Sequence, residues 1–119
     1  MILRTDTDTV DDLNEEIITT RNGVRRAVSL FSGRWKLEIL WLLNQRMHRF
    51  NELRRAIPGV TQHMLTAQLR ELKKDGLVRR TAYPEVPPRV EYELSDDARR
   101  LQPVFEAILK WAGHDPVLT

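Results

Sequence analysis

Hydrogen-bonding and cationic side chains share one face of the segment between Thr61 and Gly76. At about 100° per residue they lie opposite an apolar stripe, which predicts an amphipathic helix. The stripe consists of Met64, Leu65, Leu69 and Leu72. The opposite face carries His63, Thr66, Ala67, Arg70 and Lys74. Such a face can contact base edges and phosphates, although an ordinary core helix with a solvated charged face has the same pattern.

Both ends of this helix carry the residues that helix ends need. The hydroxyl of Thr61 can accept hydrogen bonds from free backbone N–H groups of the first turn. Gly76 suits the stop, and Lys73 and Lys74 lie near the negative end of the helix dipole. We therefore expect the helix to begin after Thr61 and to end before Gly76.

No catalytic arrangement is found in the sequence. The serines lack the glycines of a nucleophile elbow, and there is no glycine-rich phosphate loop. The 119 residues contain no cysteine, so they provide no disulfide, no thiol chemistry and no cysteine-bound zinc. His48 and His114 are far from His63 in sequence. We expect no enzyme, no metal site and no cofactor.

Length and charge are those of one basic domain with an acidic end. A chain of 119 residues with 41% apolar and 30% charged residues suits a single globular domain. Residues 1–20 hold six acids and one arginine, whereas the rest carries 18 basic and 11 acidic groups. No signal peptide or membrane span is recognised, so we expect a cytoplasmic protein without a membrane partner. The basic body is compatible with nucleic-acid binding.

The elements around the amphipathic helix predict a winged helix-turn-helix. A short helix at 49–57 ends at Pro58-Gly59, and a turn of about four residues leads to the next helix. Residues 77–82 and 89–94 are predicted strands, separated by a proline-rich turn. The predicted fold class is mainly α with a small antiparallel β-hairpin.

Further helices are predicted on both sides of this motif. The N-terminal region is expected to form helices from residue 7 or 9 to about 20 and at 24–32, separated by a break at 21–23. A helix at 34–44 is apolar nearly all round and is expected in the centre of the core. The last helix starts at Ser95 and should be kinked by Pro103. Two apolar seams on the terminal helices are candidate dimer contacts: Val10, Leu13 and Ile17, and Phe105, Ile108 and Trp111.

Three stretches carry a specific resemblance to a known family. They are GRWKLEILWLL at 33–43, RFNELRRAIPGVTQHMLTAQLRELKKDGLV at 49–78 and YPEVPPRVEYELSDDARRLQPVFEAILKW at 83–111. Together they resemble the HxlR family of bacterial winged-helix regulators over residues 24 to 112. The resemblance implies a homodimer that binds double-stranded operator DNA and regulates neighbouring genes.

The resemblance also implies which residues meet the DNA. The helix after Thr61 would enter the major groove, and its contacts would come from Thr61, Gln62, His63, Thr66, Ala67 and Arg70. Phosphate and wing contacts would come from Arg49, Asn51, Lys74, Arg79, Arg80 and Arg89. Surface solvation is the alternative for several of these, including Arg79.

The chain departs from the family pattern in one respect. Many members carry a cysteine followed by proline shortly before the motif that contains Trp35, and those positions are Asn22 and Gly23 here. Thiol-based sensing is therefore not expected. The predicted organisation is an acidic helical extension at 1–23 that makes a dimer contact, a winged helix-turn-helix with a dimerisation helix at 24–113, and a tail at 114–119.

Two other functions remain open at this point. One is a winged-helix adaptor that binds a protein instead of DNA, and the basic surface argues against it. The other is a module for a small-molecule effector, stacked on Trp41 or Trp111, with weak DNA affinity. The favoured prediction is a sequence-specific regulator, acting as a repressor on an inverted repeat.

Overall fold

The computed structural model describes the backbone of residues 7–113 and the side chains of residues 12–113. The predicted tail at 114–119 and the side chain of Val10 lie outside the described residues. The chain divides into two compact units, Met1–Ser32 and Gly33–Thr119. The predicted extension ends earlier, at residue 23, and its role as a dimer contact remains a prediction.

The described part of the first unit forms helix α1 (Thr7–Phe31). The predicted break at residues 21–23 is wrong, because α1 continues through Gly23. A glycine inside a helix costs only about 1 kcal/mol relative to alanine, which does not by itself interrupt a helix of 25 residues. Within the described part of α1, apolar side chains such as Leu13, Ile17 and Val24 are exposed.

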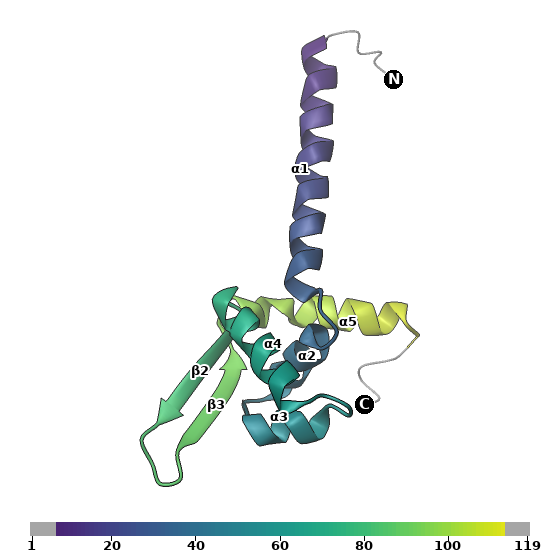
Figure 1. Ribbon diagram of the computed structural model, residues 1–119. Coiled ribbons are helices and arrows are strands. Elements are labelled where there is room, and N and C mark those ends of the chain that lie inside the picture. The colour runs from purple at the N-terminus through teal and green to yellow at the C-terminus, as the bar shows by residue number, and fades with distance from the viewer. Residues whose placement is uncertain (1–6, 114–119) are drawn as a thin grey trace. The chain divides into compact units, whose positions relative to one another are not determined.

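The second unit is a winged helix-turn-helix, which confirms the predicted fold class (Figure 1). Helix α3, a short turn and helix α4 are followed by a two-stranded hairpin, the wing. The elements are α2 (Lys36–Gln45), β1 (His48–Arg49), α3 (Phe50–Ala56), α4 (Gln62–Lys74), β2 (Val78–Tyr83), β3 (Arg89–Leu94), the 3-10 helix η1 (Ala98–Leu101) and α5 (Gln102–Trp111).

The sheet has three antiparallel strands in the order β1-β3-β2. Strands β2 and β3 pair along their whole length, from Val78 opposite Leu94 to Tyr83 opposite Arg89. Strand β1 pairs His48 with Tyr92, and the sequence did not predict it. A two-residue strand is too short to show alternation, so only its pairing with β3 defines it.

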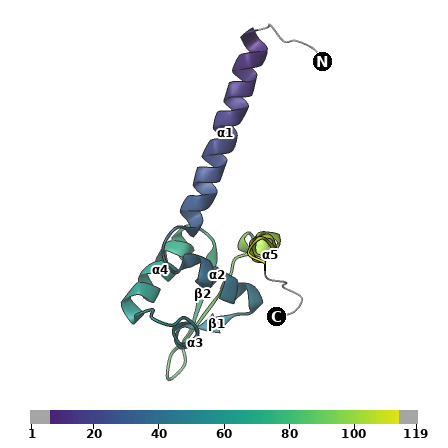
Figure 2. The same cartoon turned by 90° about the vertical axis from the view of Figure 1, so that its right-hand side faces the viewer.

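The core of the second unit is mainly aliphatic, with Trp35 and Phe105 as its buried aromatic side chains. Its fully buried large side chains are Ile39, Leu40, Leu53, Ile57, Leu65, Leu72 and Leu94. Helix α2 lies between α4 and α5 in Figure 2, which agrees with its predicted central position. Its burial is nevertheless one-sided, since Leu37 and Trp41 are 37% and 38% exposed.

An ion pair between a buried lysine and an exposed glutamate joins α2 to α4, and the sequence did not predict it. The Lys36 ammonium lies 2.6 Å from a carboxylate oxygen of Glu71, and the lysine side chain is 8% exposed. The hydrogen bond and the positive charge from Lys36 lower the pKa of Glu71. The pair thus ties the DNA-facing candidate helix to the central helix of the core.

The connections position α4 and α5. Gly59 has φ of 86°, a left-handed conformation that suits glycine, and its turn ends α3 and starts α4. Pro103 lies in the first turn of α5, so it begins this helix instead of kinking it. The first turn tolerates proline because its N–H groups have no partner within the helix.

Ser95 accepts a hydrogen bond from the Ala98 N–H at 3.1 Å, as its predicted role at the start of the last helical segment requires.

Candidate nucleic-acid interface

The start of α4 has the predicted cap. The Thr61 hydroxyl accepts a hydrogen bond from the Met64 N–H at 3.1 Å, and Gly76 follows the end of the helix with φ of 78°. Leu65, Leu69 and Leu72 are buried as predicted. Met64 is the exception, because it is 41% exposed and belongs to the edge of the outer face.

The outer face of α4 combines hydrogen-bonding groups with free cations. Gln62, His63 and Arg70 are exposed, whereas Thr66 and Ala67 are half-buried. The Thr66 hydroxyl donates to the Gln62 carbonyl at 2.8 Å, so only its oxygen lone pairs remain for another partner. Among the described side chains, no ion pair is formed by Arg70, Lys73 or Lys74.

The start of α3 is held by a carboxylate. Glu52 accepts a hydrogen bond from the backbone N–H of Arg49 at 2.9 Å and another from the Arg46 guanidinium at 3.0 Å. These two bonds, the first the larger, lower the pKa of Glu52. Arg49 and Asn51 are exposed at this end of α3, where a phosphate could approach.

A pH-dependent stability follows from Glu52. Because its pKa is lowered in the folded protein, the stabilisation is fully present above the ordinary value of 4.5 and is lost as pH falls through the folded pKa. We expect the Glu52→Gln variant to be less stable than the parent at about pH 7 and to approach it near pH 3. Urea unfolding at both pH values measures this, and an unchanged difference between parent and variant would contradict it.

A matched variant separates the two causes of the lowered pKa. Arg46→Gln removes the guanidinium but keeps the backbone N–H of Arg49. It should therefore retain part of the pH dependence that Glu52→Gln abolishes.

A groove of about 990 Å³ lies between α3 and the wing. It gathers arginines from three parts of the chain, together with two carboxylates: Arg46, Arg49, Arg55, Arg89, Glu52 and Glu85. Carboxylates engage Arg46 and Arg89. Arg49 and Arg55 form no ion pair with the described side chains, so they are the two guanidinium groups of this groove that suit the phosphate backbone of a nucleic acid. The position of Arg55, four residues after Asn51, places both on one side of α3. The sequence did not identify Arg46 as a candidate residue. Its place in the groove depends on the pairing of β1 with β3 and on the packing of α3 near the wing, and neither can be predicted from neighbouring residues.

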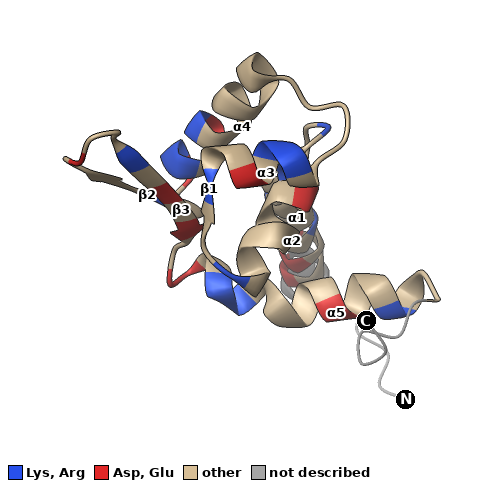
Figure 3. Cartoon of the chain, turned by 90° about the horizontal axis from the view of Figure 1, so that it is seen from below, with Lys and Arg blue, Asp and Glu red and all other residues tan. Residues whose placement is uncertain are grey.

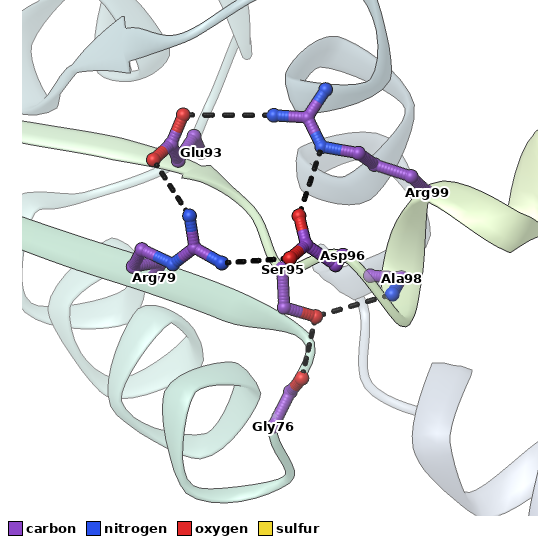
Figure 4. Close-up of polar contacts among 7 residues, drawn as sticks. All are labelled: Gly76, Arg79, Glu93, Ser95, Asp96, Ala98 and Arg99. Atoms are coloured by element: carbon purple, nitrogen blue, oxygen red, sulfur yellow. Dashed lines mark hydrogen bonds and ion pairs between the residues drawn. The ribbon is translucent and has the colours of Figure 1, made fainter.

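The arginines of the wing differ in whether a carboxylate engages their guanidinium group. Arg79 lies 3.3 Å from Glu93 and 3.7 Å from Asp96, and Arg99 joins the same two carboxylates at 3.6 and 3.9 Å (Figure 4). A guanidinium engaged by two carboxylates is poorly placed to bind phosphate. The predicted DNA contact of Arg79 is therefore not supported by its surroundings.

Arg89 is also engaged. Its guanidinium stacks over the Tyr83 ring at 4.0 Å and lies 3.2 Å from Glu85 and 3.6 Å from Glu91. Arg80 is exposed, and it forms no ion pair with any side chain that the structure describes. Arg80 is thus the wing arginine best able to meet a phosphate.

Basic and acidic segments alternate over this unit. Figure 3 shows blue segments on α3, α4 and β2, with red segments between them. The acids of α3 and β3 are the ones engaged with arginines. In the helix-turn-helix and wing, the exposed cations that form no ion pair with a described side chain lie at Arg49, Arg54 and Arg55 around α3, on α4 from Arg70 to its end, and at Arg80.

The candidate dimer residues have different surroundings. Leu13 and Ile17 are exposed on α1, and Ile108 and Trp111 are 41% and 89% exposed on α5. Phe105 is 5% exposed, so it serves the core of its own chain and offers little surface to a partner. On α5 a shallow apolar groove of about 400 Å³ is lined by Pro103, Val104, Ala107, Ile108 and Trp111.

No helix in the described part of the chain is both long and apolar enough to span a membrane. Within the same residues, no three histidine, aspartate or glutamate side chains gather as a metal site would require.

Comparisons with known proteins agree with this architecture. The profile of the HxlR-like helix-turn-helix family matches residues 30–115. An HTH-type transcriptional regulator of Methanothermobacter thermautotrophicus is 46% identical over 89 residues, which are 75% of this chain and 68% of that protein. YtcD, an HTH-type regulator of Bacillus subtilis, is 42% identical over 77% of this chain and 73% of its own length.

Solved structures of transcriptional regulators also resemble this chain. The redox regulator HypR in its reduced form superposes with a TM-score of 0.73 and 41% identity, covering 76% of this chain and 90% of that one. The reduced form of the transcriptional regulator YodB from Bacillus subtilis has a TM-score of 0.68 and 36% identity, over 74% of this chain and 79% of its own.

Proposed function

The chain belongs to the HxlR-like helix-turn-helix family, and from this premise we propose that it is a sequence-specific repressor that binds double-stranded DNA as a homodimer. That it is a transcriptional regulator with a helix-turn-helix DNA-binding domain follows from the family. The proposal adds three points to this: the homodimer, the inverted-repeat operator and the repression of transcription. It also includes a cytoplasmic location for the protein and no enzyme activity.

The outer face of α4 carries the proposal. Gln62 and His63 are exposed beside the capped start of the helix, and Arg70 is exposed without an ion pair among the described side chains. A helix in the major groove reads bases with its first turns, and an arginine can form a bidentate contact with guanine. The exposed cations beyond it would hold phosphates.

Two further parts support the same orientation on DNA. The groove between α3 and the wing brings arginines together, and on the wing Arg80 is exposed without an ion pair among the described side chains. Two copies related by a twofold axis would place their α4 helices in successive major grooves roughly 34 Å apart. Such a complex over a promoter would exclude other proteins and so repress transcription.

The signal that relieves repression differs from that of redox regulators such as HypR. These 119 residues contain no cysteine, so thiol oxidation within them cannot be the signal. The apolar groove beside Trp111 favours a flat apolar effector as the second candidate ligand.

The test is fluorescence anisotropy on DNA from upstream of the protein's own gene, beside a scrambled duplex, across a salt series. We expect specific binding at least about 10³-fold tighter than to the scrambled duplex, with a steep loss of affinity as salt rises. Equal and weak binding to both duplexes would favour the adaptor or the ligand-binding module. No binding at low salt would exclude a regulator that binds as the free protein.

A further inference from the structure

A lysine is buried at the start of α2, although lysine is seldom buried without a partner. The Lys36 side chain is 8% exposed, and its ammonium lies 2.6 Å from a carboxylate oxygen of Glu71 on α4. The backbone at Gly33 passes close to the stem of this lysine. A Cβ atom at Gly33 would lie 3.4 Å from Lys36 Cδ and 3.1 Å from Gln68 Oε1, and φ is 121°, so glycine suits this position.

The partner of this lysine is the only acid in the sequence of α4. The basic residues of the helix are Arg70, Lys73 and Lys74, and Glu71 lies among them. A carboxylate on a DNA-facing helix opposes binding in two ways. It repels phosphates, and it can pair with a cation that would otherwise bind them. Lys74 is a candidate for such a pair, because residues three apart are neighbours on a helix surface.

Two lysines therefore compete for one carboxylate, and the buried lysine forms the ion pair. Lys74 is exposed and forms no ion pair with any described side chain. The hydrogen bond from Lys36 and then its charge lower the pKa of Glu71, whereas the charge of Lys74 has a smaller effect in the same direction.

Burial explains why Lys36 forms the pair. If Glu71 moved to Lys74, a buried ammonium would be left without a partner, which is strongly unfavourable. An exposed lysine loses little when it stays unpaired, because water solvates its charge. The carboxylate therefore remains with Lys36, and Lys74 remains available to another anion.

We propose that Lys36 is a positioning residue for DNA binding: it holds the Glu71 carboxylate, so that Lys74 stays free to bind a phosphate. Lys36 itself is buried and does not meet the DNA. The inference rests on the proposed contact between α4 and DNA and deepens it, because it gives a role in binding to a residue of the interior.

Lys36→Met tests the role, because methionine keeps an unbranched side chain and removes the ammonium. Glu71 would then be uncompensated beside Lys74. We expect the affinity for every duplex to fall about three- to tenfold at roughly 0.1 M salt. The slope of log affinity against log salt should decrease by up to about one, as for the loss of one phosphate contact. Fluorescence anisotropy across a salt series measures both quantities.

Two double variants separate this effect from damage to the fold and from net charge. Adding Glu71→Gln to Lys36→Met should restore the affinity and the salt slope, because the harmful carboxylate is gone. Adding Glu38→Gln instead gives the same net charge and removes an exposed acid of α2, but leaves Glu71 uncompensated. It should not restore binding. If both double variants bound DNA alike, the proposal would be overturned.

A third comparison shows whether Lys36 acts through Lys74. In the parent, Lys74→Met should reduce the salt slope by about one. In the Lys36→Met background the same change should have little further effect, because Lys74 is already engaged by Glu71. Losses that simply add in the Lys36→Met, Lys74→Met double variant would overturn the proposal.

Thermal unfolding followed by circular dichroism shows whether each variant is folded. Gln68→Glu replaces Lys36→Met if the latter does not fold, because it keeps Lys36 and offers its ammonium a second carboxylate. It should weaken DNA binding in the same way, and Glu71→Gln should restore binding in that background. Binding unchanged by Gln68→Glu would contradict the proposal.

A measurement without DNA separates this inference from the proposed function. A parent protein that bound no duplex would contradict the proposed function. The effect of Lys36 on Lys74 would still be visible by NMR, because the Lys74 Cε signal should shift more in the Lys36→Met variant than in the parent as Glu71 titrates. Equal shifts in the two proteins would overturn the inference itself.

Discussion

Replacing Arg70 by alanine is expected to weaken binding to the operator by about 1–3 kcal/mol and to relax the preference at one base pair. Arg70 is exposed on the outer face of α4 and has no ion-pair partner among the described side chains. Its guanidinium is therefore free to donate two hydrogen bonds to a guanine. Anisotropy against a set of single-base operator variants measures both effects.

Arg80→Ala is the matched comparison. Arg80 has the same charge and similar exposure, but it lies on β2 of the wing, where contacts with phosphate are expected. Its loss should weaken binding to every duplex alike and reduce the slope of affinity against salt. If both variants bound the operator as the parent does, the assigned DNA-binding face would be wrong.

Replacing Leu65 by alanine is expected to lower the free energy of unfolding by about 2–5 kcal/mol. The side chain is 0% exposed and lies on the inner face of α4. Its removal leaves a cavity in an aliphatic core that cannot collapse fully. Chemical denaturation followed by circular dichroism gives the value.

Met64→Ala is the control, because Met64 precedes Leu65 on the same helix but is 41% exposed. Its expected cost is about 0.5 kcal/mol. The two residues were predicted to share the apolar stripe, so this pair also tests the difference between periodicity and burial. Equal costs for both variants would contradict the observed orientation of α4.

Local chemistry explains why the motif could be predicted from the sequence. The threonine cap of α4, the glycine after its end and the proline-glycine turn after α3 act on backbone groups within a few residues. Alternation at 89–94 predicted the second wing strand for the same reason. Each of these signals depends on residues only a few positions apart, so it can be recognised in a single sequence.

Some local signals were nevertheless outweighed. Gly23 suggested a break, but α1 continues through it, because one glycine costs less than the helical residues around it contribute. Pro103 suggested a kink, but the chain uses it in the first turn of α5. In both cases the residue was identified correctly, and the neighbouring structure decided its effect.

The exposure and pairing of the charged residues depended on the tertiary structure. Arg79, Arg80 and Arg89 look alike in the sequence, yet two of them are engaged with carboxylates and Arg80 forms no ion pair with any described side chain. The acids involved come from β3, the wing tip and the loop before η1. No local pattern reports which of these lies within ion-pair distance.

The sequence by itself determined the helix-turn-helix with its wing and the ends of α4, because helical period and caps are properties of neighbouring residues. Only the tertiary structure decided that Phe105 is core, that Met64 is exposed and that Arg46 joins a groove. Burial and ion pairing depend on segments distant in sequence. Their outcome is set by how those segments pack, and packing joins residues that no spacing along the chain connects.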